Sequence, residues 1–377
     1  MGLPQGGSLS SWRIGKKRCP KTRMRFMDDW ACRRAAIGIG IEIRKEGSRM
    51  RKDQKTYRRK PGQPGKAPRK SVYSRLDRIP AGEARKVITP GCLCLEGGAF
   101  RGLYTSGVLD VLMMNDINFE TTIGVSAGAL NALSYVAGQI GLSARMNLRY
   151  RRDPRYVGIG PMMSRQNQGV IGFDFLFSQM ERTEPLNRER LMQPERRMIA
   201  VATALTTGWP VYFEKKQNLD ELLMAVRASA SMPFVSRPVN VCGIRCLDGG
   251  CSVKIPFEWA LPRFEKIVVV RTRDRSFRPS LHDNSKIIHQ LYGDFPEFED
   301  VLLRMNETYI RELKEVDRLH EEGRIFEIVP SIPIRIGRLE KDVEKLGDVY
   351  WQGVHDAKEQ LPALREYLSA GHPAGTV

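Results

Sequence analysis

A pentapeptide with glycine at both ends, Gly124-Val-Ser126-Ala-Gly128, constrains this chain more than any other segment. The residues before it, Thr121–Ile123, are β-branched as in a strand, and Ala129–Val136 after it has the composition of a helix. A serine between a strand and a helix requires so sharp a reversal that side chains at Gly124 and Gly128 would clash. The pentapeptide therefore predicts a nucleophile elbow carrying Ser126, although a lone motif of this kind also occurs in ordinary glycine-rich turns.

Two further segments supply the other groups that an ester hydrolase needs, namely oxyanion donors and an acceptor for the serine proton. Glu96–Gly102 follows the apolar, strand-like Cys92–Leu95, so its backbone N–H groups can point into open space beside a helix start. Asp248 precedes two glycines and ends the strand-like segment Val239–Leu247. A phosphate-binding loop is the competing interpretation of Glu96–Gly102. No G-K-[ST] follows it, however, and Ala99 replaces the middle glycine of G-x-G-x-x-G.

Taken in this order, the three segments resemble the motifs of the patatin-like phospholipases: a D-G-G-G-x-R-G loop, a G-x-S-x-G serine and an aspartate in D-G-G or D-G-A. The resemblance covers residues 87–261 as a catalytic core, and it implies a serine acyl hydrolase acting on lipid esters. By position it implies Ser126 as the nucleophile and Asp248 as its base, without a histidine. It also gives roles to the oxyanion-hole residues Gly97, Gly98 and Ala99, and to the supporting residues Arg101 (which braces the loop), Gly102, Gly124, Gly128, Gly249 and Gly250.

Three positions depart from the family pattern. Glu96 stands where the family has aspartate, Ala99 stands at the third glycine, and Lys254 stands where many members have asparagine, although Pro256 is kept. An oxyanion donor is a backbone N–H, so alanine can serve if its backbone conformation is open to a residue with a Cβ. We expect these departures to affect substrate range and rate more than the fold.

Histidine provides the main alternative to a Ser-Asp dyad. The chain has five histidines, and none lies between the Glu96–Gly102 loop and Asp248. A Ser-Asp-His triad of the α/β-hydrolase type remains open through His282 or His289, whose surroundings look like a polar loop entering a helix. A second alternative is a lipid-binding module with weak or no catalysis. The retention of both Ser126 and Asp248 favours the enzyme.

Short apolar segments alternate with longer helix-like ones from Gly91 onward, which predicts an α/β fold with a mostly parallel central sheet and helices on both faces. Residues 145–194 are rich in Arg, Met and Phe, and we expect a cap-like insertion there. Residues 262–377 are expected to continue the same α/β body, with a charged amphipathic helix over 300–322. The uncharged stretch 121–144 contains glycines and polar residues, so it predicts a buried helix and not a membrane span.

Residues 1–86 form a basic extension that differs from the rest of the chain. Residues 1–90 contain 25 Lys and Arg against seven Asp and Glu, so they account for the whole net charge of +18. Proline, glycine and like charges predict disorder in the extension. A passive tail is one interpretation, and attraction to an anionic membrane surface is the other. Nucleic-acid binding is less favoured because the remaining residues, which contain every candidate site residue, carry no net charge.

The cysteines predict the compartment. The chain has seven cysteines, and this odd number favours free thiols in a reducing cytoplasm over a disulfide framework. The cysteines lack C-x-x-C spacing and nearby histidines, so we expect no metal site. The extension lacks the apolar h-region and cleavage site of a secretory signal. We therefore expect a cytoplasmic enzyme without cofactors, with peripheral contact at the inner membrane surface if the basic extension binds lipid.

Overall fold

A computed structural model describes residues 71–167, 169–216, 218–279 and 284–370 of the chain. Most of the expected basic extension, residues 1–70, therefore lies outside the described residues, as does His282. No helix in the described ranges combines the length and the apolar character needed to cross a membrane.

Residues 71–86, which the sequence assigns to the disordered extension, instead pack on the body. Tyr73 is only 2% exposed. Its N–H donates to the Leu148 carbonyl at 3.3 Å, and its hydroxyl accepts from Trp351 Nε1 at 3.0 Å. Ile79 is buried as well. The boundary predicted at residue 86 is thus wrong, because a few apolar side chains without a regular period anchor a segment whose charges suggested disorder.

The main sheet contains eight of the described strands, in the order β10-β9-β2-β3-β5-β8-β7, with β6 paired to β5. The four pairs from β10 to β5 are parallel, whereas β6, β7 and β8 are antiparallel to their neighbours. This arrangement confirms the predicted α/β fold with a mostly parallel sheet. The strands are β2 (Thr89–Leu95), β3 (Phe119–Val125), β5 (Arg197–Ala204), β6 (Pro210–Glu214), β7 (Val239–Val241), β8 (Ile244–Asp248), β9 (Ile267–Val270) and β10 (Phe326–Ile328). A separate antiparallel pair joins β1 (Gly82–Glu83) and β4 (Gln139–Ile140).

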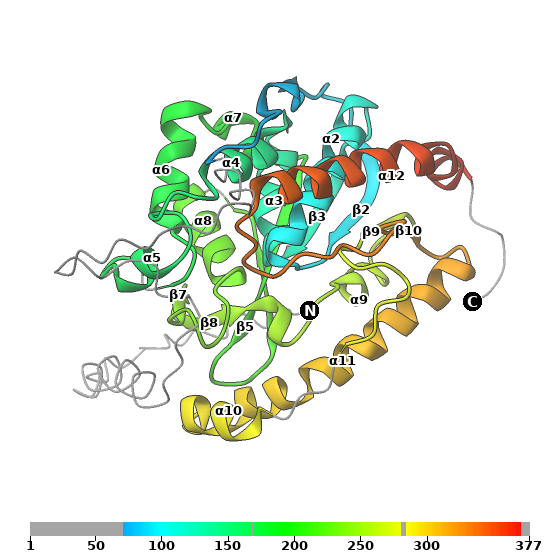
Figure 1. Cartoon of the computed structure of the whole chain (residues 1–377). Helices are drawn as coiled ribbons and strands as arrows, with labels where there is room; N and C mark the ends of the chain where they lie inside the picture. The colour runs from blue at the N-terminus through cyan, green and yellow to red at the C-terminus, as the bar shows by residue number, and fades with distance from the viewer. Residues whose placement is uncertain (1–70, 168, 217, 280–283, 371–377) are drawn as a thin grey trace, which may run out of the picture. The chain divides into compact units, whose positions relative to one another are not determined.

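Alternate residues of the central strands point into two cores, as strands buried on both faces require. In β2, Leu93 and Leu95 enter the first core, while Cys92 and Cys94 enter the second. Helices α2 (Gly102–Met114), α3 (Ala127–Val136), α4 (Leu142–Tyr150), α8 (Leu219–Ser229) and α12 (Val343–Ser369) contribute to the first core. Helices α9 (Phe257–Ala260) and α11 (Pro296–Glu321) contribute to the second (Figure 1).

The segment expected to be a cap, residues 145–194, contains the end of α4 and three further helices. These are α5 (Ile159–Met163), α6 (Phe173–Thr183) and α7 (Arg188–Leu191). The remaining elements are α10 (Ser285–Tyr292) and the 3-10 turns η2 (Leu76–Arg78), η3 (Ala99–Arg101) and η4 (Gly249–Cys251). The predicted amphipathic helix of 300–322 is the longer α11, which buries Leu302 and Leu313 but leaves Leu303 exposed.

Helix α12 packs against α2 through glycines on both helices. A Cβ at Gly107 would overlap the Tyr350 carbonyl oxygen, and a Cβ at Gly353 would overlap the Tyr104 carbonyl oxygen. Each helix therefore approaches the backbone of the other directly. This contact attaches the C-terminal helix to the helix that follows the Glu96–Gly102 loop.

We predict that Gly353→Ala destabilises the fold by about 1–3 kcal/mol, because the added methyl group forces α12 away from α2. We expect this loss of stability even though alanine has a higher helix propensity than glycine. Chemical denaturation measures the free energy of unfolding. The matched control is Gly337→Ala, where a Cβ would meet no atom within 4 Å and the expected change is within about 0.5 kcal/mol. Unchanged or increased stability in Gly353→Ala would refute the close α2–α12 contact.

Candidate active site

The sheet register brings the three predicted segments to one place. Parallel strands β2 and β3 end together, with Leu95 opposite Gly124, so the loop after β2 and Ser126 after β3 begin side by side. Val125 pairs with Val201 of β5, and the next residue of β5, Ala202, pairs with Asp248. Asp248 is therefore level with Ser126, two strands away across the sheet.

Ser126 occupies the sharp turn between β3 and α3 that the motif predicts. Its backbone has φ 55° and ψ −119°, a conformation that costs a residue with a Cβ about 1–3 kcal/mol. The N–H of Ser126 donates to Ser229 Oγ at 2.9 Å, which fixes the turn from α8. The helix that starts at the next residue then directs its N-terminal end toward the serine.

The glycines of the elbow are required by the space around them. A Cβ at Gly124 would lie 2.5 Å from the carbonyl carbon of Gly128, and a Cβ at Gly128 would lie 2.5 Å from the Leu95 carbonyl oxygen. A Cβ at Gly102 would lie 2.8 Å from the Ala127 Cβ. The elbow, the end of β2 and the start of α2 thus meet without intervening side chains.

Asp248 accepts a direct hydrogen bond from the Ser126 hydroxyl, with 2.7 Å between Ser126 Oγ and Asp248 Oδ2. The other carboxylate oxygen, Oδ1, accepts from the Gly250 N–H at 2.8 Å, and a Cβ at Gly250 would lie only 3.1 Å from the same oxygen. Both side chains are nearly buried, at 9% exposure for Ser126 and 6% for Asp248. Burial raises the pKa of Asp248, and the hydrogen bonds from Ser126 and Gly250 lower it by less.

The loop after β2 presents backbone donors beside Ser126. The Gly97 N–H donates to the Lys254 carbonyl at 3.3 Å. The Gly98 and Ala99 N–H groups, by contrast, reach no acceptor within the described part of the chain. Ala99 adopts φ 49°, a left-handed conformation that glycine adopts more easily. Of the three expected oxyanion donors, Gly98 and Ala99 are therefore the ones available to a substrate in this conformation.

Arg101 closes the loop through its backbone. Its N–H donates to the Gly98 carbonyl at 3.1 Å, whereas its Nε has no hydrogen-bond partner in the ranges the structure describes. The side chain is 8% exposed. Burial lowers the pKa of Arg101 to about 10, and the nearby charges of Arg273 and Arg338 add to this effect. The bracing role implied for the Arg101 side chain remains a prediction.

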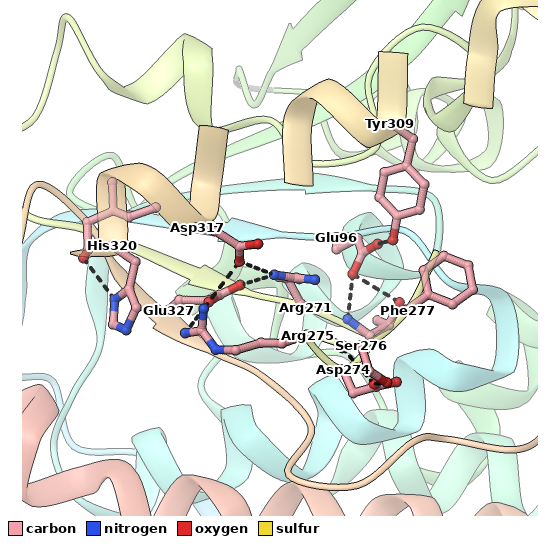
Figure 2. A network of polar contacts seen from close by, with 12 residues as sticks. Glu96, Arg271, Asp274, Arg275, Ser276, Phe277, Tyr309, Asp317, His320 and Glu327 are labelled. Carbon is pink, nitrogen blue, oxygen red and sulfur yellow. Dashed lines mark hydrogen bonds and ion pairs between the residues drawn. The ribbon is translucent and has the colours of Figure 1, made fainter. Parts of the chain in front are cut away.

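Glu96 connects the start of the loop to the C-terminal half of the chain. Its Oε2 accepts from the Thr272 N–H at 2.5 Å and from Thr272 Oγ1 at 3.2 Å. Its Oε1 accepts from the hydroxyl of Tyr309 on α11 (Figure 2). No local pattern in the sequence pointed to Thr272 or Tyr309. Sequence reasoning also missed Ser229, whose only signal is its place at the end of α8.

A narrow cavity with mostly apolar walls lies beside Ser126. Half of its lining residues come from the loop, the elbow and α3, and three come from residues 145–194. Its lining residues are Ala99, Phe100, Gly102, Leu103, Ser126, Ala127, Leu130, Asn131, Ser143, Asn147, Tyr156, Ile171, Ala230 and Met232. A cavity of this character suits a hydrocarbon chain positioned next to the serine.

Within the described residues, the histidines lie apart from the Ser126–Asp248 pair. His289 Nδ1 contacts Glu299 at 3.0 Å, and its side chain is largely exposed. On α12, the exposed His355 lies beside the buried Asp356 and the exposed Glu359. No hydrogen bond joins a described histidine to Ser126 or Asp248.

Comparisons with known proteins identify a family and several similar chains. Residues 93–261 match the family described as patatin-like phospholipase, and residues 295–369 match a domain of unknown function. The chain is 30% identical over 277 residues to the uncharacterized protein YjjU of Escherichia coli (strain K12), covering 70% of this chain and 75% of that protein. It is 24% identical over 214 residues to the probable lipid hydrolase 463L of Invertebrate iridescent virus 6, covering 50% and 72%. The crystal structure of VipD from Legionella pneumophila aligns at 13% identity with a TM-score of 0.40, covering 75% and 68%.

The burial of Asp248 predicts how an activity that depends on a Ser126–Asp248 dyad would respond to acid. Only the carboxylate form can accept the serine proton, and a raised pKa means that the carboxylate is lost as the pH falls through a value above the ordinary 3.8. We therefore expect the acidic limb of kcat/KM for a soluble ester to have its midpoint above 3.8. Circular dichroism over the same range shows whether the fold persists. A midpoint at or below 3.8 in folded protein would contradict the burial argument.

Proposed function

This chain belongs to the patatin-like phospholipase family, and we propose that it cleaves the carboxylic ester bonds of phospholipids or lysophospholipids with Ser126 as nucleophile and Asp248 as its base. The family makes the chain a lipid acyl hydrolase. The observation that carries the finer proposal is the 2.7 Å hydrogen bond from Ser126 Oγ to Asp248, at the edge of an apolar cavity.

In the proposed reaction, Asp248 takes the hydroxyl proton as Ser126 Oγ attacks the ester carbonyl carbon. The Gly98 and Ala99 N–H groups donate to the carbonyl oxygen as it becomes negative, and the N-terminal end of α2 adds positive potential. Collapse of the tetrahedral intermediate breaks the ester C–O bond, and the alcohol leaves with the proton from Asp248. Asp248 then takes a proton from water as the water attacks the acyl-Ser126 ester, and returns it to Ser126 Oγ as the acyl–Oγ bond breaks and the fatty acid leaves.

The acyl chain is proposed to occupy the apolar cavity, because one wall of the cavity is formed by the nucleophile elbow itself. The polar part of the lipid would then remain at the mouth. This arrangement favours substrates with a long hydrocarbon chain over small polar esters. The hydrogen bond between Ser126 and Asp248 also favours an enzyme over a lipid-binding module, because lipid binding alone does not require a carboxylate beside the Ser126 hydroxyl.

The first prediction is that Ser126→Ala lowers ester hydrolysis by about 10³-fold or more, and that Asp248→Asn lowers it by about 10²–10⁴-fold. Both variants should remain folded. Turnover of a panel of acyl esters by the purified protein measures the effect. The matched control is Ser134→Ala, which changes a buried serine on α3 whose hydroxyl donates to the Asn131 carbonyl. Wild-type turnover in Ser126→Ala would end the nucleophile assignment.

A second prediction separates the dyad from the triad. His282→Ala and His289→Ala should each leave kcat within about two-fold of wild type, because the dyad mechanism assigns no proton transfer to histidine. The same ester assay applies. A histidine variant as inactive as Ser126→Ala would replace the dyad by a Ser-Asp-His triad.

A third prediction concerns membrane contact, for which we propose residues 1–70, with 21 Lys and Arg against five Asp and Glu. Their charge would bring a cytoplasmic enzyme to an anionic inner membrane surface. Deletion of residues 1–70 should leave turnover of a soluble ester unchanged and weaken binding to anionic vesicles, and added salt should reproduce that loss. Equal vesicle binding by both proteins at low salt would remove this proposal.

A further inference from the structure

Two of the departures from the family pattern, Glu96 and Lys254, both contact helix α11. We infer that α11 is a positioning element of the proposed active site. In this role Tyr309 holds the loop Glu96–Gly102, here called the oxyanion loop, and Glu312 holds the loop after Asp248 that contains Lys254 and Ile255. This inference rests on the proposed function, because it concerns how the Ser126 site is kept in order. It also gives a role to part of the C-terminal segment 295–369, which matches a domain of unknown function.

The first connection runs from α11 to the start of the oxyanion loop. Glu96 is 1% exposed, so its carboxylate depends on protein donors. The Tyr309 hydroxyl donates to Oε1, while the backbone and side chain of Thr272 donate to Oε2. Thr272 Oγ1 is also within 3.3 Å of the Gly97 carbonyl oxygen. Figure 2 shows Glu96 reaching toward Tyr309 on the helix. An aspartate, one methylene shorter, would draw its carboxylate back from Tyr309.

The second connection runs from α11 to the loop after Asp248. The buried Glu312 carboxylate accepts from the Lys254 N–H at 3.1 and 3.2 Å and from the Ile255 N–H at 3.3 Å. The Lys254 ammonium donates to the Gly250 carbonyl at 2.6 Å. Gly250 in turn donates its N–H to Asp248, so this connection ends at the proposed base.

Lys254 joins the two connections. Its carbonyl oxygen accepts from the Gly97 N–H at 3.3 Å, so the residue held by Glu312 also holds the oxyanion loop. Its ammonium nitrogen lies 5.5 Å from the centre of the Tyr309 ring, a cation–π distance. One lysine therefore contacts both loops and both residues of α11. The asparagine found in many family members is too short to extend an ammonium group to the same places.

Helix geometry makes Tyr309 and Glu312 act together. Residues three apart lie on the same face of a helix, so the two side chains leave α11 in nearly one direction. The helix is anchored by Leu313, Val316 and Leu319 in the second core. It is also held by the contact of Asp317 with the buried Arg271 at 3.0 Å (Figure 2). A rigid, anchored helix can therefore set the spacing between the oxyanion donors and Asp248.

Spacing of this kind affects the rate more than substrate binding. A misplacement of about 1 Å at a reacting group can cost about 10²-fold in rate. Neither Tyr309 nor Glu312 lines the cavity beside Ser126, so their loss removes no contact with the acyl chain. The expected signature of a positioning role is therefore a lower kcat with little change in KM.

The test compares Tyr309→Phe and Glu312→Gln with Glu315→Gln on the same helix, where Glu315 forms an ion pair with the exposed Arg318. Turnover of a soluble acyl ester gives kcat and KM, and thermal unfolding shows that each variant is folded. We expect kcat to fall about 10–100-fold in the first two variants with KM within about two-fold, and no change in Glu315→Gln. Wild-type kcat in folded Tyr309→Phe and Glu312→Gln would overturn the inference.

A double-variant cycle separates positioning from general weakening of the fold. Because Tyr309 acts through Glu96, Tyr309→Phe should lower kcat no further once Glu96→Gln is present, whereas independent losses would multiply. Multiplied losses would overturn the connection through Glu96. If Tyr309→Phe does not fold, Glu96→Asp withdraws the carboxylate from the hydroxyl instead, and an unchanged kcat there overturns the same connection.

The outcomes also distinguish this inference from the proposed function. Activity that survives in Ser126→Ala rejects the Ser126 mechanism, whatever the α11 variants do. Activity that is lost in Ser126→Ala but is unchanged in the folded α11 variants rejects only the positioning role.

Discussion

The backbone reversal at Ser126 is the constraint on which the rest of this site depends. It places a residue with a Cβ at φ 55°, and it is possible only because Gly124 and Gly128 leave room for the chain to turn. The same Gly128 presses against the Leu95 carbonyl, so the turn also fixes where β2 ends and the oxyanion loop begins. One steric requirement therefore sets the position of the proposed nucleophile relative to the proposed oxyanion donors.

Three buried carboxylates hold the segments of this site, and each accepts hydrogen bonds from protein donors. Asp248 accepts from Ser126 and Gly250, Glu96 accepts from Thr272 and Tyr309, and Glu312 accepts from two backbone N–H groups. A buried carboxylate without such partners would be costly, so losing one donor disturbs the loop that the carboxylate holds. Burial raises the pKa of Asp248 and brings that of Glu312 to about 8. The site is thus held by polar contacts that depend on protonation as well as on packing.

The sequence predicted features with a local steric or periodic signature. The elbow at Ser126, the mostly parallel sheet and the position of Asp248 at a strand end all follow from glycine spacing and apolar alternation. Contacts between distant segments left no such signature. Tyr309 is 213 residues from Glu96, and its place beside the oxyanion loop follows from how α11 packs, not from its neighbours in the chain. The anchoring of residues 71–86 through Tyr73 was hidden for the same reason.

The central claim is that Ser126 forms the covalent acyl intermediate. It is tested most directly by treating the active enzyme with a fluorophosphonate and mapping the modified peptide by mass spectrometry. The account predicts a single adduct per chain, on Ser126, that forms in parallel with the loss of ester hydrolysis. An adduct on another residue that accompanies the same loss, or complete inactivation with Ser126 unmodified, would contradict it.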